Sequence, residues 1–537
     1  MPLFLQLRTW LREVPRSERH LTGIAGVVLA FLLVLALWPT GTTKTTAVDV
    51  GLPAPATTQT TPASPTGTTP TAATGGPAPV TGSTGSTAAV SGPVVPVTPV
   101  TPVGPAPTSG PTTSVTNPTS PPGSSSKPGS KGPSASACAG VKATGPGVTA
   151  TTVKVVTTNL SLAGPIGNSA FDVRPDLANI AQALADDYNA KGGVGCGRKI
   201  VLKQYDVNPL DSNDQQTKCL QVQQDQPLIV IDFGGYLTPT ARKCFADAKI
   251  PITEATPFGT DELKSSYPYA FGMRSVAEQA VHQGIIGLNA RGFFTTPAVT
   301  KVGLFEDSCA PTVNKQIQDD LNRIGIPNSK ISTFTLGCDI AAQPNQILQA
   351  VLQHKADGVS HVFLATSNTN EQNYVKLADG QGFHPRYGMS DYGESMTQSG
   401  AGNWQKSFDG AVGITSSHMG EFASGQSNPD LKECDATMKR HGVPGFSSEA
   451  KDTAVAGYCD MFKFFAAIMA KAGVNPTRET LAPTVATLGT FVDGYVGDGI
   501  FNRPGKITGG DFQRELQYHA DCGCWKIVDK TMAPDYP

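Results

Sequence analysis

The sequence carries no excess charge of either sign. Its 41 Lys and Arg residues nearly balance 43 Asp and Glu residues, which leaves a formal net charge of −2. It also lacks a basic stripe with interleaved aromatic residues, the usual footprint of a nucleic-acid-binding protein. We therefore do not expect nucleic acid among its partners.

The usual catalytic and cofactor motifs are missing as well. The sequence contains no Gly-x-Ser-x-Gly elbow, no Walker A loop and no His-Glu-x-x-His pair. Cys522-Gly-Cys524 has no pair of histidines at ligand spacing beside it, so we predict no metal site. Gly497-Asp498-Gly499 lacks the flanking strand and helix of a dinucleotide fingerprint. We therefore expect neither an enzyme nor a bound cofactor.

Residues 39–137 are poor in both charge and large apolar side chains. The segment consists mainly of Thr, Pro, Ser, Gly, Ala and Val. Because it offers too little apolar surface to offset the entropy of ordering, we predict a disordered linker, partly polyproline-like. Its Thr, Ser and Pro density suits O-glycosylation, and an unmodified spacer is the alternative.

One long apolar run is present, at residues 21–38. As a helix rising ~1.5 Å per residue it spans roughly 27 Å, enough for the hydrocarbon core of a membrane. Arginines from Arg8 to Arg19 precede it, and the basic side of such a span stays in the cytoplasm. We predict a cytoplasmic tail at 1–20 and a single-pass signal anchor at 21–38, with the rest of the chain outside the cell membrane. A cleaved signal peptide is the alternative, although its apolar region is usually only ~7–15 residues long.

Cysteine is missing from the first 137 residues. All ten cysteines lie at or after Cys138, on the side predicted to be extracytoplasmic. An even number of cysteines in that compartment favours disulfide bonds. Since no cysteine directly follows residues 21–38, we do not expect a lipid anchor.

From residue 148 the apolar pattern alternates between strand and helix. Strands are predicted at 152–158, 200–205, 227–232, 250–253, 302–305, 331–335, 359–364 and 387–389. Helices are predicted at 176–190, 214–224, 238–248, 276–290, 312–324, 343–354 and 371–381. Such alternation is typical of an α/β fold with parallel sheets and helices on both faces. There are too many strands for one sheet, so we expect two doubly wound lobes.

Residues 181–206 resemble a known family. A helix ends in Lys-Gly-Gly, a Gly-rich turn follows, and an apolar strand opens. This sequence pattern is similar to that of the type I periplasmic solute-binding proteins of ABC transporters, in the leucine/isoleucine/valine branch. Those proteins commonly carry Asn-x-x-Gly-Gly-Val-x-Gly-Arg-x-Ile at this point. The corresponding residues here are Asn189, Gly192, Gly193, Val194, Gly197, Arg198 and Ile200, with one more residue than the pattern between Val194 and Gly197.

The resemblance implies a two-lobed solute-binding domain at 138–537. Lobe 1 would hold about 145–273 and 415–490, and lobe 2 about 274–413 and 491–537. Three segments would join the lobes as a hinge, near 271–275, 411–417 and 491–501. The last of these contains FVDGYVGDGIF, whose glycines and acidic residues suit a flexible hinge or a hairpin.

In open parallel sheets, ligands bind beyond the carboxyl ends of the strands. The candidate ligand-binding residues of lobe 1 are Tyr236, Thr238, Thr253, Ala255, Thr256, Gly259 and Thr260. Those of lobe 2 are Glu306, Asp307, Ser367, Asn368, Asp391 and Tyr392. Tyr236 would offer a stacking surface, and Thr238 is either a ligand contact or only a helix N-cap.

The resemblance suggests how lobe 1 would hold a carboxylate. The family uses hydroxyls and backbone N–H groups of a Ser/Thr segment after the fourth strand. Two registers fit, Thr253/Ala255/Thr256 and Thr256/Gly259/Thr260, and Thr256 belongs to both. Glu254 is unexpected beside such a site.

In lobe 2 the family places an acidic residue near the ligand ammonium. Asp391 or Glu394 could take this role, with Tyr392 stacking on the ammonium. Relatives also carry a Tyr-Gly pair after the first strand of lobe 2. This chain has Glu306-Asp307-Ser308 there instead.

The resemblance also implies three disulfides. They are Cys219–Cys244 and Cys434–Cys459, each between two helices, and Cys309–Cys338, between two loops after neighbouring strands. The pairing of Cys138, Cys196, Cys522 and Cys524 stays open.

The resemblance implies an extracytoplasmic protein that captures a small polar ligand, of the amino acid or amide class, between its lobes. A partner ABC permease or sensor would then read the closed state. The alternative is a membrane-tethered sensor or cell-envelope protein that has the same fold and an altered or lost ligand site.

Overall fold

The computed structural model describes residues 138–160, 176–209, 211–338, 343–426 and 428–535, and all of them lie in one compact unit, Thr119–Pro537. The predicted tail, anchor and linker at 1–137 lie outside the described residues. So do residues 161–175.

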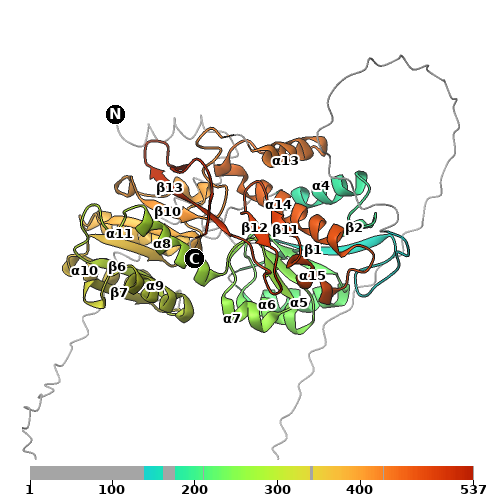
Figure 1. Cartoon of the computed structure of the whole chain (residues 1–537), viewed down its shortest axis with the longest axis horizontal. Helices are drawn as coiled ribbons and strands as arrows, with labels where there is room; N and C mark the ends of the chain where they lie inside the picture. Colours follow the sequence, from blue (N-terminus) through green and yellow to red (C-terminus); the bar gives the residue numbers. More distant parts are fainter. Residues whose placement is uncertain (1–137, 161–175, 210, 339–342, 427, 536–537) are drawn as a thin grey trace, which may run out of the picture. The chain divides into compact units, whose positions relative to one another are not determined.

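The first sheet is fully parallel and has five strands in the order β2-β1-β3-β4-β5. They are β1 (Thr152–Leu160), β2 (Lys199–Val207), β3 (Ile229–Asp232), β4 (Ile252–Glu254) and β5 (Ala270–Gly272). The connecting helices are α4 (Leu177–Ala190), α5 (Ser212–Asp225), α6 (Pro239–Asp247) and α7 (Thr260–Ser266). In Figure 1, α5, α6 and α7 lie along one side of this sheet and α4 lies on the other, beside α14 (Glu449–Ala472).

The second sheet has eight strands. Seven follow the order β14-β13-β10-β9-β8-β6-β7, and β15 pairs with β13. Its parallel part is β6 (Val302–Asp307), β7 (Ile331–Leu336), β8 (His361–Ala365), β9 (Arg386–Ser390) and β10 (Val412–Thr415). Its antiparallel edge is β13 (Phe512–His519), β14 (Cys524–Ile527) and β15 (Ala533–Pro534).

Helices cover both faces of the second sheet. One face carries α8 (Ala277–Ala290) and α9 (Pro311–Arg323), and the other carries α10 (Gln343–Ala356) and α11 (Asn368–Gly380). The shorter helices are α12 (Gln398–Ala401), η1 (Asn328–Lys330), η2 (Asp391–Gly393) and η3 (Lys406–Phe408). The remaining elements are α13 (Pro429–Arg440), α15 (Arg478–Val485) and the antiparallel pair β11 (Gly489–Phe491) and β12 (Gly499–Phe501).

The α/β architecture with two doubly wound sheets is therefore confirmed, and the predicted elements coincide with observed ones to within a few residues. β5, β10, β14 and β15 were not predicted, because elements of two to four residues leave too little periodicity to detect. The seven-residue α7 and the eight-residue β13 were not predicted either. Residues 491–501 were expected as a hinge or hairpin, and they contain the turn between β11 and β12.

Three chain segments cross between the two sheets, and they bond to one another. The first follows β5 (272–276), the second follows β10 (415–421) and the third precedes β13 (491–511). Gly272 N–H donates to the carbonyl of Ile507 over 3.1 Å, and His418 N–H to that of Tyr495 over 3.0 Å. Gly509 packs so closely that an added Cβ would lie 2.0 Å from the carbonyl oxygen of Met273. Only glycine fits this crossing without moving the backbone.

The structure also holds five disulfides. Cys219–Cys244, Cys309–Cys338 and Cys434–Cys459 are the pairs that the resemblance implied. The four cysteines whose pairing was left open form the bonds Cys138–Cys196 and Cys522–Cys524.

Within the described residues, one helix is long and apolar enough to cross a membrane, residues 452–472 of α14. Most of that stretch is buried inside the fold, where Phe462, Phe465 and Ile468 join the core of the first sheet. We therefore regard α14 as a core helix.

Candidate functional site

The candidate ligand-binding residues lie at or just beyond the carboxyl ends of parallel strands in both sheets. Tyr236 and Thr238 follow β3, and the segment from Thr253 to Thr260 runs from β4 into α7. In the second sheet, Glu306 and Asp307 end β6, Ser367 and Asn368 follow β8, and Asp391 and Tyr392 follow β9. The contacts of each side chain decide which of them remain open to a ligand.

Tyr236 does not present the expected stacking surface. Its side chain is only 4% exposed, and it covers Gly234 so closely that a Cβ there would overlap the tyrosine ring. Beside it, the buried carboxylate of Asp232 accepts hydrogen bonds from Thr158 Oγ1 over 2.7 Å and Leu237 N over 2.9 Å. Burial raises the pKa of Asp232. This corner of the sheet is thus filled by the protein's own groups.

Thr238 is a helix cap. Its Oγ1 accepts a hydrogen bond from Ala241 N over 3.4 Å, at the start of α6. The same hydroxyl and the Thr238 N–H both donate to Oε1 of the buried Gln215, over 2.9 and 2.7 Å. Thr238 therefore both caps α6 and bonds to Gln215.

A buried ion cluster occupies the end of β4. Arg242 of α6 donates to Glu254 Oε2 over 3.0 Å and to both carboxylate oxygens of Glu262 over 2.5 and 3.0 Å. Thr256 Oγ1 donates to the same oxygen of Glu254 over 3.0 Å. Burial raises the pKa of Glu254 to about 8, even though Arg242 acts to lower it. The hydroxyl of Thr256 is therefore held by Glu254, and Thr253 and Ala255 are buried beside it.

The amino end of α7 is also occupied. Gly259 is the N-cap residue, and the N–H and Oγ1 of Thr260 donate to Glu278 Oε2 over 2.9 and 2.5 Å. Thr312 Oγ1 donates to the other oxygen of Glu278 over 2.6 Å. Burial acts to raise the pKa of Glu278, but the hydrogen bonds from the two threonines outweigh it and lower the pKa. The N–H and hydroxyl of Thr260 are thus both bound by a carboxylate of the protein.

The carboxylates at the end of β6 are largely buried. Thr335 Oγ1 donates to Glu306 Oε1 over 3.0 Å. Burial raises the pKa of Glu306, and it raises that of Asp307 to about 6. The Cys309–Cys338 disulfide ties the loop after β6 to the loop after β7.

Beyond β8 the buried acid is a residue that the sequence analysis did not propose. Ser367 is exposed, and the side chain of Asn368 accepts a hydrogen bond from Gln372 over 2.8 Å. Glu371, one turn along α11, is 1% exposed and accepts from Thr366 N over 3.0 Å. Burial raises its pKa to about 8. A glutamate in the first turn of a helix is ordinary in sequence, so no signal distinguished it.

Asp391 joins the crossing segment that follows β10. One of its oxygens, Oδ2, accepts from Ser416 N over 2.6 Å and from Ser416 Oγ over 2.8 Å. The residue is 2% exposed, and Oδ1 has no hydrogen-bond partner among the described residues. Burial raises the pKa of the neighbouring Tyr392, so its phenol stays neutral.

Arg274 lies on the first crossing segment and approaches Glu394. The Nη1–Oε1 distance is 3.8 Å, and Arg274 is 6% exposed. Its Nε and Nη1 atoms are buried and have no hydrogen-bond partner in the described part of the chain. The available signal in the sequence was a charged residue inside the segment near 271–275 that was expected to cross between lobes.

A second ion cluster joins the other two crossing segments. His418 bonds to Glu421 through Nδ1 over 2.8 Å and to Asp498 through Nε2 over 3.1 Å. Arg514 of β13 reaches the same oxygen of Glu421 over 2.7 Å. Although burial acts to lower the pKa of His418, these carboxylates raise it to about 10. His418, Asp493 and Asp498 are close enough to hold a metal ion, but a doubly protonated imidazole has no lone pair to offer one.

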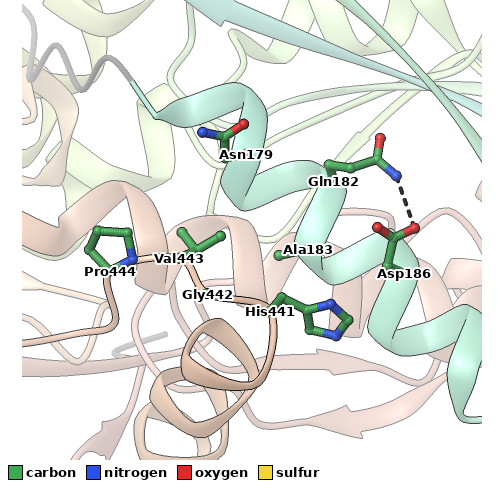
Figure 2. A pocket seen from close by; sticks show the side chains of 8 residues that line it. All are labelled: Asn179, Gln182, Ala183, Asp186, His441, Gly442, Val443 and Pro444. Atoms are coloured by element: carbon green, nitrogen blue, oxygen red, sulfur yellow. Dashed lines mark hydrogen bonds between the residues drawn. The ribbon is translucent and has the colours of Figure 1, made fainter.

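Two surface pockets lie away from these residues. One, of about 310 Å³, is lined by Asn179, Gln182, Ala183 and Asp186 of α4 and by residues 441–444 after α13 (Figure 2). In Figure 2 the wall from α4 is polar, and Gln182 bonds to Asp186 over 2.9 Å. The other, of about 400 Å³, lies between α5 and α6 beside Cys244. Neither contains a predicted ligand contact.

No protein-family model matches the chain, and no curated protein matches it. Solved structures do match. A branched-chain amino acid ABC transporter protein from Thermus thermophilus with bound valine is 12% identical, with a TM-score of 0.55 over 72% of this chain and 97% of that chain. A fatty acid ABC transporter substrate-binding protein from Thermomonospora curvata is 16% identical, with a TM-score of 0.54 over 74% and 95%. A possible leucine/isoleucine/valine-binding protein from Rhodopirellula baltica is 15% identical, with a TM-score of 0.54 over 71% and 96%. At these identities the likeness shows the fold.

Proposed function

Starting from the type I periplasmic binding protein fold, we propose that this chain is an extracytoplasmic solute-binding protein of an ABC-type uptake system. The observation that carries the proposal is the set of buried polar side chains at the carboxyl ends of strands in both sheets, with three crossing segments between them. Two such sheets can trap a small polar ligand by closing on it. The protein works by binding and carries out no reaction.

The sheets belong to two lobes in this proposal. Lobe 1 holds about 145–273 and 415–490, and lobe 2 about 274–413 and 491–537. A ligand stabilises the closed arrangement only by as much as it binds that arrangement more tightly than the open one. The partner permease then reads the closed state.

The ligand belongs to the amino acid or amide class in this proposal. The Thermus protein has valine bound, whereas the Thermomonospora protein is described as serving fatty acids. The fold therefore accommodates more than one ligand chemistry, and side chains decide between them.

The proposal also includes the membrane anchor and the linker. A helix at 21–38 would hold the protein in the cell membrane, and residues 39–137 would let the binding domain reach its partner. No lipid is needed for this attachment.

A second candidate is a membrane-tethered sensor or envelope protein with an altered ligand site. The specific observation that favours it is that Thr256 is hydrogen-bonded to Glu254, and Thr260 to Glu278. Both hydroxyls stood in the segment expected to hold a ligand carboxylate.

A ligand screen separates the two candidates. The full-length chain, purified in mild detergent, would be unfolded by heat in the presence of amino acids, amides, short peptides and fatty acids. A compound at 100 times its Kd adds ~2.7 kcal/mol of stability, which is easily seen as a raised Tm. Hydrogen exchange at residues 272–276 and 493–498 would report hinge closure by the same compound. Stabilisation with hinge protection supports the uptake protein, and no response to any compound supports the sensor.

A further inference from the structure

Arg274 is a buried cation with unused hydrogen-bond donors in the described part of the chain. It follows β5 on the first crossing segment and is 6% exposed. The donors at Nε and Nη1 find no acceptor among the described residues, and the nearest carboxylate oxygen, on Glu394, is 3.8 Å from Nη1. A contact of that length is too long for a hydrogen bond.

Such an arrangement is unusual because a buried guanidinium is normally paired and hydrogen-bonded. Arg242, in the same part of the fold, shows the ordinary case. It uses Nε, Nη1 and Nη2 on two carboxylates, at distances between 2.5 and 3.0 Å. Nε and Nη1 of Arg274 lack an equivalent partner among the described residues, so an anion that accepts from them would use these two donors.

The other donors expected to hold a ligand carboxylate are taken. Thr256 Oγ1 donates to Glu254, and the N–H and Oγ1 of Thr260 donate to Glu278. Both acceptors belong to the protein. A ligand carboxylate at either place would have to displace a charged side chain from its hydrogen bonds.

The acidic residues near Arg274 differ in how freely they can move. Glu394 approaches from the turn after η2, and its side chain is 37% exposed. Asp391 and Asp232 lie near enough to act on Glu394 electrostatically. Asp391 is bound to Ser416 through Oδ2, so it is not free to turn toward the arginine. Glu394 is therefore the group that a ligand anion would displace.

Resting on the proposed function, we propose that Arg274 binds the carboxylate of the ligand and thereby selects carboxylate-bearing solutes over their neutral amides. The ligand enters when the sheets separate at the hinge. Its carboxylate takes the place opposite Nη1 that Glu394 now approaches, and Glu394 turns toward solvent. The specificity of the site thus depends on the crossing segment and not on the Ser/Thr segment after β4.

Matched pairs of compounds test this on the full-length chain in mild detergent. The probes are L-valine and L-valinamide, butyrate and butyramide, and succinate and succinamide, with Kd measured by calorimetric titration. We expect at least one carboxylate to bind, and its amide to bind roughly tenfold to hundredfold more weakly, as lost hydrogen bonds to a charged group imply. In Arg274→Gln the two members of that pair should bind equally.

Two further variants keep the result interpretable. Arg478 is also 6% exposed and donates to the carbonyl of Pro227, at the opposite end of β3. Arg478→Gln is therefore the matched control for loss of a buried arginine, and it should keep the carboxylate preference. Should Arg274→Gln fail to fold, Glu394→Gln removes the competing carboxylate and should tighten carboxylate binding severalfold.

The outcomes are distinct. Tighter binding of an amide than of its carboxylate, or a carboxylate preference that persists in Arg274→Gln, overturns the role of Arg274 and leaves the solute-binding function standing. Unchanged carboxylate affinity in Glu394→Gln overturns it as well. If no compound of this panel or of the wider screen binds the wild-type chain, the proposed function fails, and the inference with it.

Discussion

Replacing Glu371 with glutamine should stabilise the protein at alkaline pH and leave it unchanged at acid pH. Glu371 is 1% exposed, and one carboxylate oxygen accepts from Thr366 N over 3.0 Å. The other oxygen, Oε2, has no hydrogen-bond partner in the described residues. Glutamine has the shape of the protonated acid and can keep the bond from Thr366, so the substitution removes only the charge.

The magnitude follows from the pKa of this carboxyl, which burial raises from 4.5 to about 8. Below pH 4.5 the folded and unfolded states are both protonated, and the charge costs nothing. As the pH rises toward 8, the unfolded state releases a proton that the folded state keeps, so stability falls. At ~1.4 kcal/mol per pH unit, the total loss reaches about 5 kcal/mol above pH 8. Glu371→Gln should not lose this stability as the pH rises.

The assay is urea unfolding of the full-length chain at several pH values from 4 to 9. The free energy of unfolding of Glu371→Gln should equal that of wild type at pH 4 and exceed it by several kcal/mol at pH 9. The matched control is Glu278→Gln, because hydrogen bonds lower the pKa of Glu278. That variant should lose stability at neutral pH and approach wild type as the pH falls. A difference between Glu371→Gln and wild type that stays constant from pH 4 to 9 would refute the reasoning.

Three further substitutions test other buried contacts by the same unfolding assay. His418→Gln should cost ~3–5 kcal/mol at pH 7 because it leaves buried carboxylates uncompensated, and the cost should shrink as the pH rises from 6.5 to about 10, where wild-type His418 loses its own charge; a constant cost would contradict its role as a cation. Tyr458→Phe should cost ~1–2 kcal/mol, since the phenol donates to the carbonyl of Thr158 over 2.9 Å; an unchanged stability would show that this bond contributes nothing. Gly509→Ala should destabilise the fold and speed hydrogen exchange in the crossing segments, because its Cβ would meet the carbonyl of Met273; normal exchange would mean that the backbone yields there at little cost.

The α/β architecture could be predicted because its signals are local. Alternating apolar residues mark β1, and a Gly-Gly stop after Asn189 ends α4 where the structure ends it. Short elements were missed for the same reason. A three-residue strand such as β5 is defined by its neighbour β4, and its own residues show no pattern.

The sequence predicted where the candidate site lies, but not the role of each residue in it. The residues after β3, β4, β6, β8 and β9 do lie at the carboxyl ends of parallel strands. Their roles could not be assigned, since Thr238 meets Gln215 and Asp391 meets Ser416, both partners distant in sequence. Glu254 stood out in the sequence as unexpected, and the structure supplies its reason, a buried pair with Arg242.

The sequence by itself determined the alternation of strands and helices, since each element depends on the periodicity of its own residues. Only the tertiary structure decided which polar groups are already satisfied. Glu278 comes to Thr260 because the chain turns back at the first crossing segment, and Nε and Nη1 of Arg274 keep no acceptor because, among the described residues, no carboxylate comes within hydrogen-bonding distance of them. Hydrogen bonds depend on distances of a few ångström between side chains, and no pattern along the chain encodes such distances across a hinge.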